Sequence, residues 1–106
     1  MPDFLGMMGK MQELQGRMEK MQAELEATEV TGVAGGGLVS VTLTAKGGLR
    51  KVSIDESLLK PSEKEIVEDL ISAAHAEARA KAERMMQDKM RELTGGLPLP
   101  PGLKLT

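Results

Sequence analysis

A stripe of methionine and leucine side chains runs through the first quarter of the chain and determines its first element. Its members recur at alternating spacings of four and three: Met7, Met11, Leu14, Met18, Met21 and Leu25. This heptad spacing places all six on one face of an α-helix, which we expect over residues 3–27. Glycines at 6, 9 and 16 each weaken such a helix by up to about 1 kcal/mol relative to alanine, so its start should fray. We call the stripe the Met seam and interpret it as a packing surface.

The rest of the core must be built almost without aromatic side chains. The 106 residues include one Phe, no Trp and no Tyr, but nine Met. The chain has no Cys, which excludes disulfides and thiolate metal sites. No apolar run approaches the ~20 residues of a membrane span, and the start, MPDFLGMMGK, lacks the basic flank and apolar centre of a signal peptide. We therefore expect one cytoplasmic domain with no membrane partner.

The hydrophobic period changes to two between about residues 26 and 55, which predicts strands. Three segments fit: EVTGV (29–33), LVSVTLT (38–44) and LRKVSID (49–55). In the second, Val39, Val41 and Leu43 share one face. Short connections make neighbouring strands antiparallel, so the segments form a meander whose apolar face must be covered by helices.

A second helix is expected over residues 63–93. Ser62 and Glu65 are spaced as a capping box at its start, and Thr94-Gly95-Gly96 ends it. Its expected inner face comprises Ile66, Val67, Leu70, Ile71, Ala74, Ala78, Ala82, Met86, Met90 and Leu93. The many alanines between 73 and 82 should let another helix approach closely. Residues 94–106 read as an extended tail rich in Pro and Gly.

These elements predict an α+β fold, with a single α-βββ-α domain over residues 1–93 and the tail over 94–106. A helix of about 30 residues spans roughly 45 Å, whereas a compact globule of this size has a radius of gyration of only about 13 Å. At least one helix must therefore project past the sheet. A Met seam exposed on a projecting helix needs a partner, and a two-fold homodimer is the commonest way to supply one.

No catalytic or cofactor site can be assembled from the sequence. The stretch GVAGGGLV (32–39) resembles a phosphate-binding loop, but it lies between two strands and lacks the Lys-Ser/Thr pair and following helix of a P-loop. We expect a hairpin with positive φ values or a bulge there. His75 is the only histidine, so no metal cluster or catalytic triad forms around it. We predict no enzyme activity, no metal and no cofactor.

The remaining signal is a basic segment in the second half of the second helix. Residues 79–91 carry five basic side chains against two acidic ones. If the two helices run antiparallel, the start of the first neighbours the end of the second, and their cations gather away from the sheet. The candidate DNA-binding residues are Lys10, Arg17, Lys20, Arg79, Lys81, Arg84, Lys89 and Arg91. Such arms would contact phosphates without reading bases; an ordinary solvated helix face remains the alternative.

Four stretches give the chain a family resemblance: EVTGVAGGGLVSVTL, VSIDESLL, EIVEDLISAAHAEA and LTGGLPLPPGLKL. With the Met- and Gln-rich first helix, they resemble the YbaB/EbfC family of bacterial nucleoid-associated proteins over nearly the whole length. The resemblance implies a tweezer-like α+β homodimer with projecting helices. It also implies a location in the nucleoid and binding of duplex DNA that bends or bridges it, with an effect on gene expression.

Two hypotheses for function follow. The first is a dimeric, non-enzymatic protein that binds duplex DNA; the absence of aromatic side chains on the basic segments disfavours a reader of single strands or RNA. The second is a protein-interaction module, in which the Met seam and the Leu-Pro tail dock a protein of DNA replication or repair, because Met side chains suit adaptable interfaces.

Overall fold

Two long helices and a three-stranded sheet make up the described part of the chain, residues 4–93 of the computed structural model. The long elements are α1 (Phe4–Ala27), β1 (Glu29–Ala34), β2 (Val39–Thr44), β3 (Leu49–Ile54) and α2 (Lys64–Leu93). Single turns of 3-10 helix connect them: η1 (Gly35–Gly37), η2 (Glu56–Leu58) and η3 (Pro61–Glu63). The predicted α+β class is confirmed. The tail, 94–106, lies outside the described residues.

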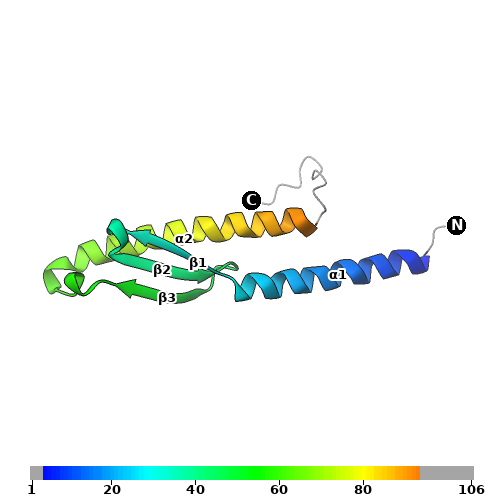
Figure 1. Cartoon of the computed structure of the whole chain (residues 1–106), viewed down its shortest axis with the longest axis horizontal. Helices are drawn as coiled ribbons and strands as arrows, with labels where there is room; N and C mark the ends of the chain where they lie inside the picture. Colours follow the sequence, from blue (N-terminus) through cyan, green and yellow to red (C-terminus); the bar gives the residue numbers. More distant parts are fainter. Residues whose placement is uncertain (1–3, 94–106) are drawn as a thin grey trace.

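The sheet is an antiparallel meander in the order β1-β2-β3, and α2 lies across one of its faces (Figure 1). Alternation places Val39, Val41 and Leu43 of β2 on the covered face, where all three are buried. Since α2 packs mainly against β1 and β2, the same face remains open at β3. There Leu49 is 63% exposed and Val52 is 39% exposed.

The alanines of α2 serve a different purpose from the one predicted. Ala74, Ala78 and Ala82 are buried, but the backbone that approaches them belongs to strand β1. A Cβ atom placed on Gly32 would overlap the carbonyl oxygen of Ala74 and the amide nitrogen of Ala78. At Ala74 and Ala78, therefore, the close approach is made by a strand and not by the expected helix.

Two details of α2 also differ from expectation. The helix begins at Lys64, directly after the turn η3, whose first residue is Pro61. No capping hydrogen bond between Ser62 and Glu65 is formed in the described structure. Ile66 is 49% exposed and Met86 is 39% exposed, so neither lies on the inner face. Met85 packs against the core in place of Met86.

Helix α1 is held to the sheet only at its carboxyl-terminal end. Leu25 is buried there, and the amide of Ala45 donates hydrogen bonds to the carbonyls of Leu25 and Thr28 (3.1 and 2.9 Å). The rest of α1 projects beyond the sheet (Figure 1). The radius of gyration of 19.6 Å and extents of 74 × 27 × 16 Å confirm the predicted projection.

Candidate nucleic-acid interface

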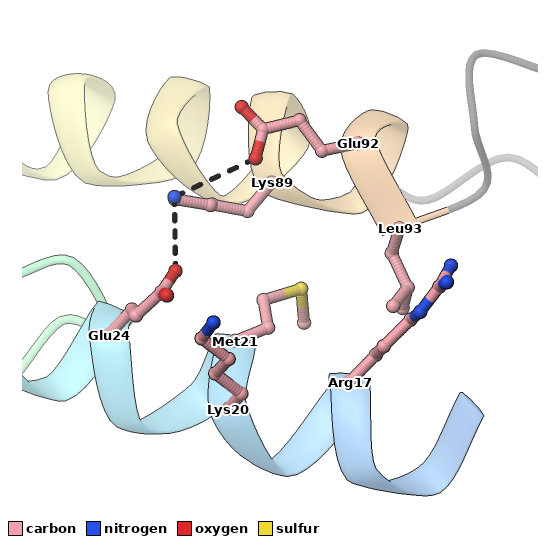
Figure 2. A pocket seen from close by; sticks show the side chains of 7 residues that line it. All are labelled: Arg17, Lys20, Met21, Glu24, Lys89, Glu92 and Leu93. Carbon is pink, nitrogen blue, oxygen red and sulfur yellow. Dashed lines mark hydrogen bonds and ion pairs between the residues drawn. The ribbon is translucent and has the colours of Figure 1, made fainter. Parts of the chain in front are cut away.

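Three cationic side chains meet where the end of α2 lies beside α1. Figure 2 shows Arg17 and Lys20 of α1 and Lys89 of α2 around an open hollow of about 180 Å³. Its other lining residues are Met21, Glu24, Glu92 and Leu93. The helices are antiparallel, as predicted, but Leu93 lies near Arg17 and not near the start of α1. The amino-terminal half of α1 therefore extends past the last residues of α2, and this corrects the expected pairing of their ends.

Lys89 ties the two helices together through carboxylates. Its Nζ lies 3.1 Å from Oε2 of Glu24 and 3.7 Å from Oε2 of Glu92, and its side chain is 30% exposed. The hydrogen bond to Glu24 and the negative charges of both glutamates raise the pKa of Lys89 above its ordinary value. Because the pKa of Lys89 is raised in the folded chain, the stability that this contact gives is complete below the unfolded pKa of about 10.4. It is lost only as pH rises through the folded pKa. The tie thus persists at neutral pH.

Other candidate cations are paired on their own helix. Arg17 lies 2.7 Å from Glu13, Arg79 lies 3.2 Å from Glu83, and Arg91 lies 3.8 Å from Asp88. These pairs are exposed, so each stabilises its helix only slightly, and a phosphate can displace the carboxylate.

The second half of α2 does not gather all its cations at the projecting end. Lys81 lies 3.3 Å from Glu77 and donates a hydrogen bond of 2.7 Å to the carbonyl of Thr31 in β1. This turn of α2 therefore lies against the edge of the sheet. Lys10 lies on the part of α1 beyond the end of α2. The expected single cluster of all eight cations is therefore wrong. Three of them line the hollow, and the other five are spread along the two helices.

Three of the candidates make no ion pair within residues 4–93: Lys10, Lys20 and Arg84. All three are exposed. Lys20 lines the hollow, and Arg84 lies seven positions before Arg91, on the same face of α2. These side chains can meet an external anion without first losing a carboxylate.

The Met seam is largely open to solvent within one chain. Met7, Met11, Leu14 and Met18 are 58%, 69%, 48% and 39% exposed, Met21 is half-buried beside the hollow, and only Leu25 is buried. Within residues 4–93, therefore, only the end of the seam at Leu25 belongs to the core, and no described element covers the four large apolar side chains before Met21.

The glycine-rich turn has the geometry of a connection and not of a phosphate site. Gly35, Gly36 and Gly37 have φ values of +64°, +68° and +98° between β1 and β2, which confirms the prediction of positive φ. No long helix follows to direct its dipole at an anion. His75 is exposed on α2. Residues 4–93 contain no group of three side chains suited to a metal ion, and no described helix is long and apolar enough to cross a membrane.

Sequence reasoning missed the acidic partners in the hollow. Glu92 could have been found, because it lies three positions after Lys89 on the same helix face. Glu24 is separated from Lys89 by 65 positions, and no local pattern signals that contact.

Comparison with known proteins gives a consistent result over almost the whole chain. Residues 1–97 match the family model of the YbaB/EbfC DNA-binding family. A nucleoid-associated protein of Rhizobium meliloti is 55% identical over 105 residues, covering 99% of this chain and 98% of the relative. Another, from Rhodopseudomonas palustris strain BisB5, is 60% identical over 105 residues, with 99% of each covered. The crystal structure of an uncharacterized protein from Helicobacter pylori shares the fold, with a TM-score of 0.79 and 24% identity over 90% of this chain and 100% of that one.

Proposed function

Because the chain belongs to the YbaB/EbfC DNA-binding family, we propose that it binds duplex DNA in the bacterial nucleoid as a homodimer, mainly through phosphates. The observation that carries this proposal is the set of exposed cations without ion pairs in the described structure, Lys10 and Lys20 on α1 and Arg84 on α2. The proposal assigns no catalytic step and no cofactor.

Phosphate contact fits the composition of these surfaces. Lysine and arginine neutralise phosphates and release condensed counterions, which gives affinity without sequence information. In the hollow between α1 and α2, Glu24 and Glu92 already pair with Lys89. Arg17 and Lys20 line the same hollow and can bind a phosphate there. We therefore assign the first phosphate contacts to Lys10, Lys20 and Arg84, with Arg17, Arg79, Lys81, Lys89 and Arg91 as secondary contacts.

The homodimer is proposed from the apolar surfaces that one chain leaves open. The Met seam exposes four large side chains along α1, and β3 exposes Leu49 and Val52 on a face that α2 covers elsewhere. A second copy would cover such surfaces with identical ones, as a two-fold interface does. A dimer carries two sets of projecting helices, which would let it bend one duplex or bridge two.

The test compares two double charge reversals of equal size. Lys20→Glu with Arg84→Glu should weaken binding to every duplex alike and should reduce the steepness of the salt dependence by about two phosphates. Lys60→Glu with Lys64→Glu, at the opposite end of α2, is the matched control and should bind like the wild type. Binding is measured by fluorescence anisotropy over a salt series. Equal affinities for both double variants and the wild type would reject the assignment.

A protein-interaction module remains the second candidate, favoured by a separate observation. A hollow of about 410 Å³ lies at the end of the molecule away from the projecting helices. Its lining residues are Leu58, Leu59, Pro61 and Val67, with Lys60, Lys64 and Glu68 beside them, and Leu59 is 66% exposed. Proteins of DNA replication or repair would be the partners. Pull-down from nuclease-treated lysate separates the candidates, because partners bridged by DNA are lost and directly bound proteins are kept.

A further inference from the structure

Lys89 joins α2 to α1 across the hollow. Its Nζ lies 3.1 Å from Oε2 of Glu24 on α1, and the two side chains are only 30% and 43% exposed (Figure 2). On its own helix, Oε2 of Glu92 lies 3.7 Å from the same nitrogen. Both carboxylates are thus within ion-pair distance of one ammonium group, and without it they would repel each other across the hollow. Lys89 therefore keeps the two helices together at this point.

Helix α1 takes its direction from contacts near its carboxyl-terminal end. The sheet holds it there through the buried side chain of Leu25 and the hydrogen bonds from the amide of Ala45. Farther out, Met21 of α1 and Leu93 of α2 are half-buried and line the same hollow as Lys89. The ionic contact lies between these two places, where it opposes a swing of α1 away from α2.

Two of the cations assigned to phosphates lie on opposite sides of this contact. Lys20 lies four positions before Glu24 on α1, which is roughly 6 Å farther from the sheet. Arg84 lies five positions before Lys89 on α2, which is roughly 7.5 Å back toward the start of that helix. Because the helices are antiparallel, these two displacements point in opposite directions. The separation of Lys20 from Arg84 therefore depends on how the two helices are held together.

We infer that Lys89 is a positioning residue for DNA binding, which acts through Glu24. It holds α1 and α2 at the spacing at which Lys20 and Arg84 contact the phosphates of one duplex. This inference rests on the proposed binding of DNA and adds a determinant of its strength. Phosphates occupy regular positions along a duplex, so cations on two helices bind together only when their spacing fits. When the fitting arrangement is populated for only part of the time, the apparent affinity falls in proportion to that fraction. Lys89 itself remains a secondary contact, because two carboxylates already pair with it.

Glu24 should favour DNA binding although its charge repels phosphate. Glu24→Ala should weaken duplex binding by roughly 5- to 10-fold, between the effect of an exposed ion pair and that of a charged hydrogen bond. The salt dependence should stay the same, because the bound protein still neutralises the same phosphates. Glu13→Ala is the matched control: it removes the same charge from α1, but the carboxylate of Glu13 pairs with Arg17 of the same helix at 2.7 Å. This control should strengthen binding by roughly 1.4- to 5-fold.

An exchange of charges tests the same contact by rescue. Lys89→Glu should weaken binding by about 10-fold or more, because carboxylates then face each other across the hollow. Lys89→Glu with Glu24→Lys restores an ion pair between the helices and should return the affinity to within about 3-fold of the wild type. Lys89→Glu with Glu19→Lys has the same composition and net charge, but Glu19 lies about 140° around α1 from Glu24, away from the hollow. This last variant should stay weak. Affinities are measured by fluorescence anisotropy over a salt series, with circular dichroism to verify the helix content.

The outcomes separate positioning from the proposed function. A Glu24→Ala protein that binds duplex DNA as tightly as the wild type, or more tightly, would overturn the positioning role and keep the phosphate contacts. Equal affinities for the two charge-compensated variants would also overturn it, because net charge alone would then explain both. A salt dependence of Glu24→Ala that is lower by a whole phosphate would overturn it as well, since it indicates a lost contact. No wild-type binding to any duplex at low salt would reject the proposed function and the inference together.

Discussion

Replacing Gly32 by alanine tests the closest approach in the fold. Gly32 lies buried in β1 against the backbone of α2, and an added Cβ would overlap the carbonyl oxygen of Ala74 and the amide nitrogen of Ala78 and lie 3.0 Å from Cα of Ala78. All three atoms belong to the backbone, so no side chain can rotate away. The strand and the helix must separate, which also loosens the packing of the buried alanines.

The expected cost follows from overpacking. Extra methylenes in well-packed cores cost about 1–3 kcal/mol and occasionally more. Because the clash is with backbone, we expect Gly32→Ala to lower the free energy of unfolding by about 3 kcal/mol. That is a large share of the 5–15 kcal/mol typical of whole proteins. At about 4–8 °C per kcal/mol for a domain of this size, the melting temperature should fall by roughly 12–24 °C.

The assay is thermal and urea unfolding followed by circular dichroism, at equal protomer concentration because association adds to stability. Gly16→Ala is the control: a Cβ there meets no atom within 4 Å, and alanine in a helix should raise stability by up to about 1 kcal/mol. A Gly32→Ala protein within about 0.5 kcal/mol of the wild type, the usual range for inconsequential surface changes, would refute the close approach.

Three further outcomes are expected. Leu14→Lys places a charge in the Met seam and should reduce the mass seen by light scattering from twice 11.4 kDa to that of one chain; an unchanged dimer would remove the seam from the interface. The hydroxyl and then the amide of Ser57 lower the pKa of Asp55, so stability from this contact is present above the unfolded pKa of about 3.9 and lost as pH falls through the folded value. Ser57→Ala should therefore move the pKa of Asp55 part of the way back up in a carboxyl NMR titration. Glu13→Gln frees Arg17 from its ion pair and should raise DNA affinity by roughly 1.4- to 5-fold, the equivalent of one exposed pair; weaker binding would contradict phosphate contact by Arg17.

The secondary structure could be predicted because its signals are local. The Met seam has a helical period, and the alternation around Val41 has a period of two. The ends that these patterns predict for α1 and β2 lie within one residue of the ends in the structure. Glycines between two strands required positive φ values, and these are present. Each of these inferences needs only neighbouring residues.

The contacts between distant segments could not be predicted in the same way. The alanines of α2 indicate that another backbone approaches closely, but small side chains do not show whether it belongs to a helix or a strand. The approaching residue is Gly32 of β1, whose missing side chain makes the contact possible. Likewise, the pairing of Lys89 with Glu24 depends on the angle between α1 and the sheet and on where α2 ends. That angle is set by the burial of Leu25 and by the hydrogen bonds of Ala45, which no periodic pattern encodes.

We expect intramolecular ion pairing to limit how strongly this chain binds DNA through phosphates. Eight cations were candidates, but five of them already face carboxylates at 2.7–3.8 Å. When a phosphate displaces a carboxylate, the carboxylate stays nearby and repels it, so a paired cation contributes less than a full contact. The logarithm of the affinity falls with the logarithm of the salt concentration by about 0.9 for each phosphate neutralised. With Lys10, Lys20 and Arg84 acting fully, the slope should lie near about −3 per chain and not near about −7, the value for all eight. A slope near the larger value would show that the ion pairs open completely on DNA.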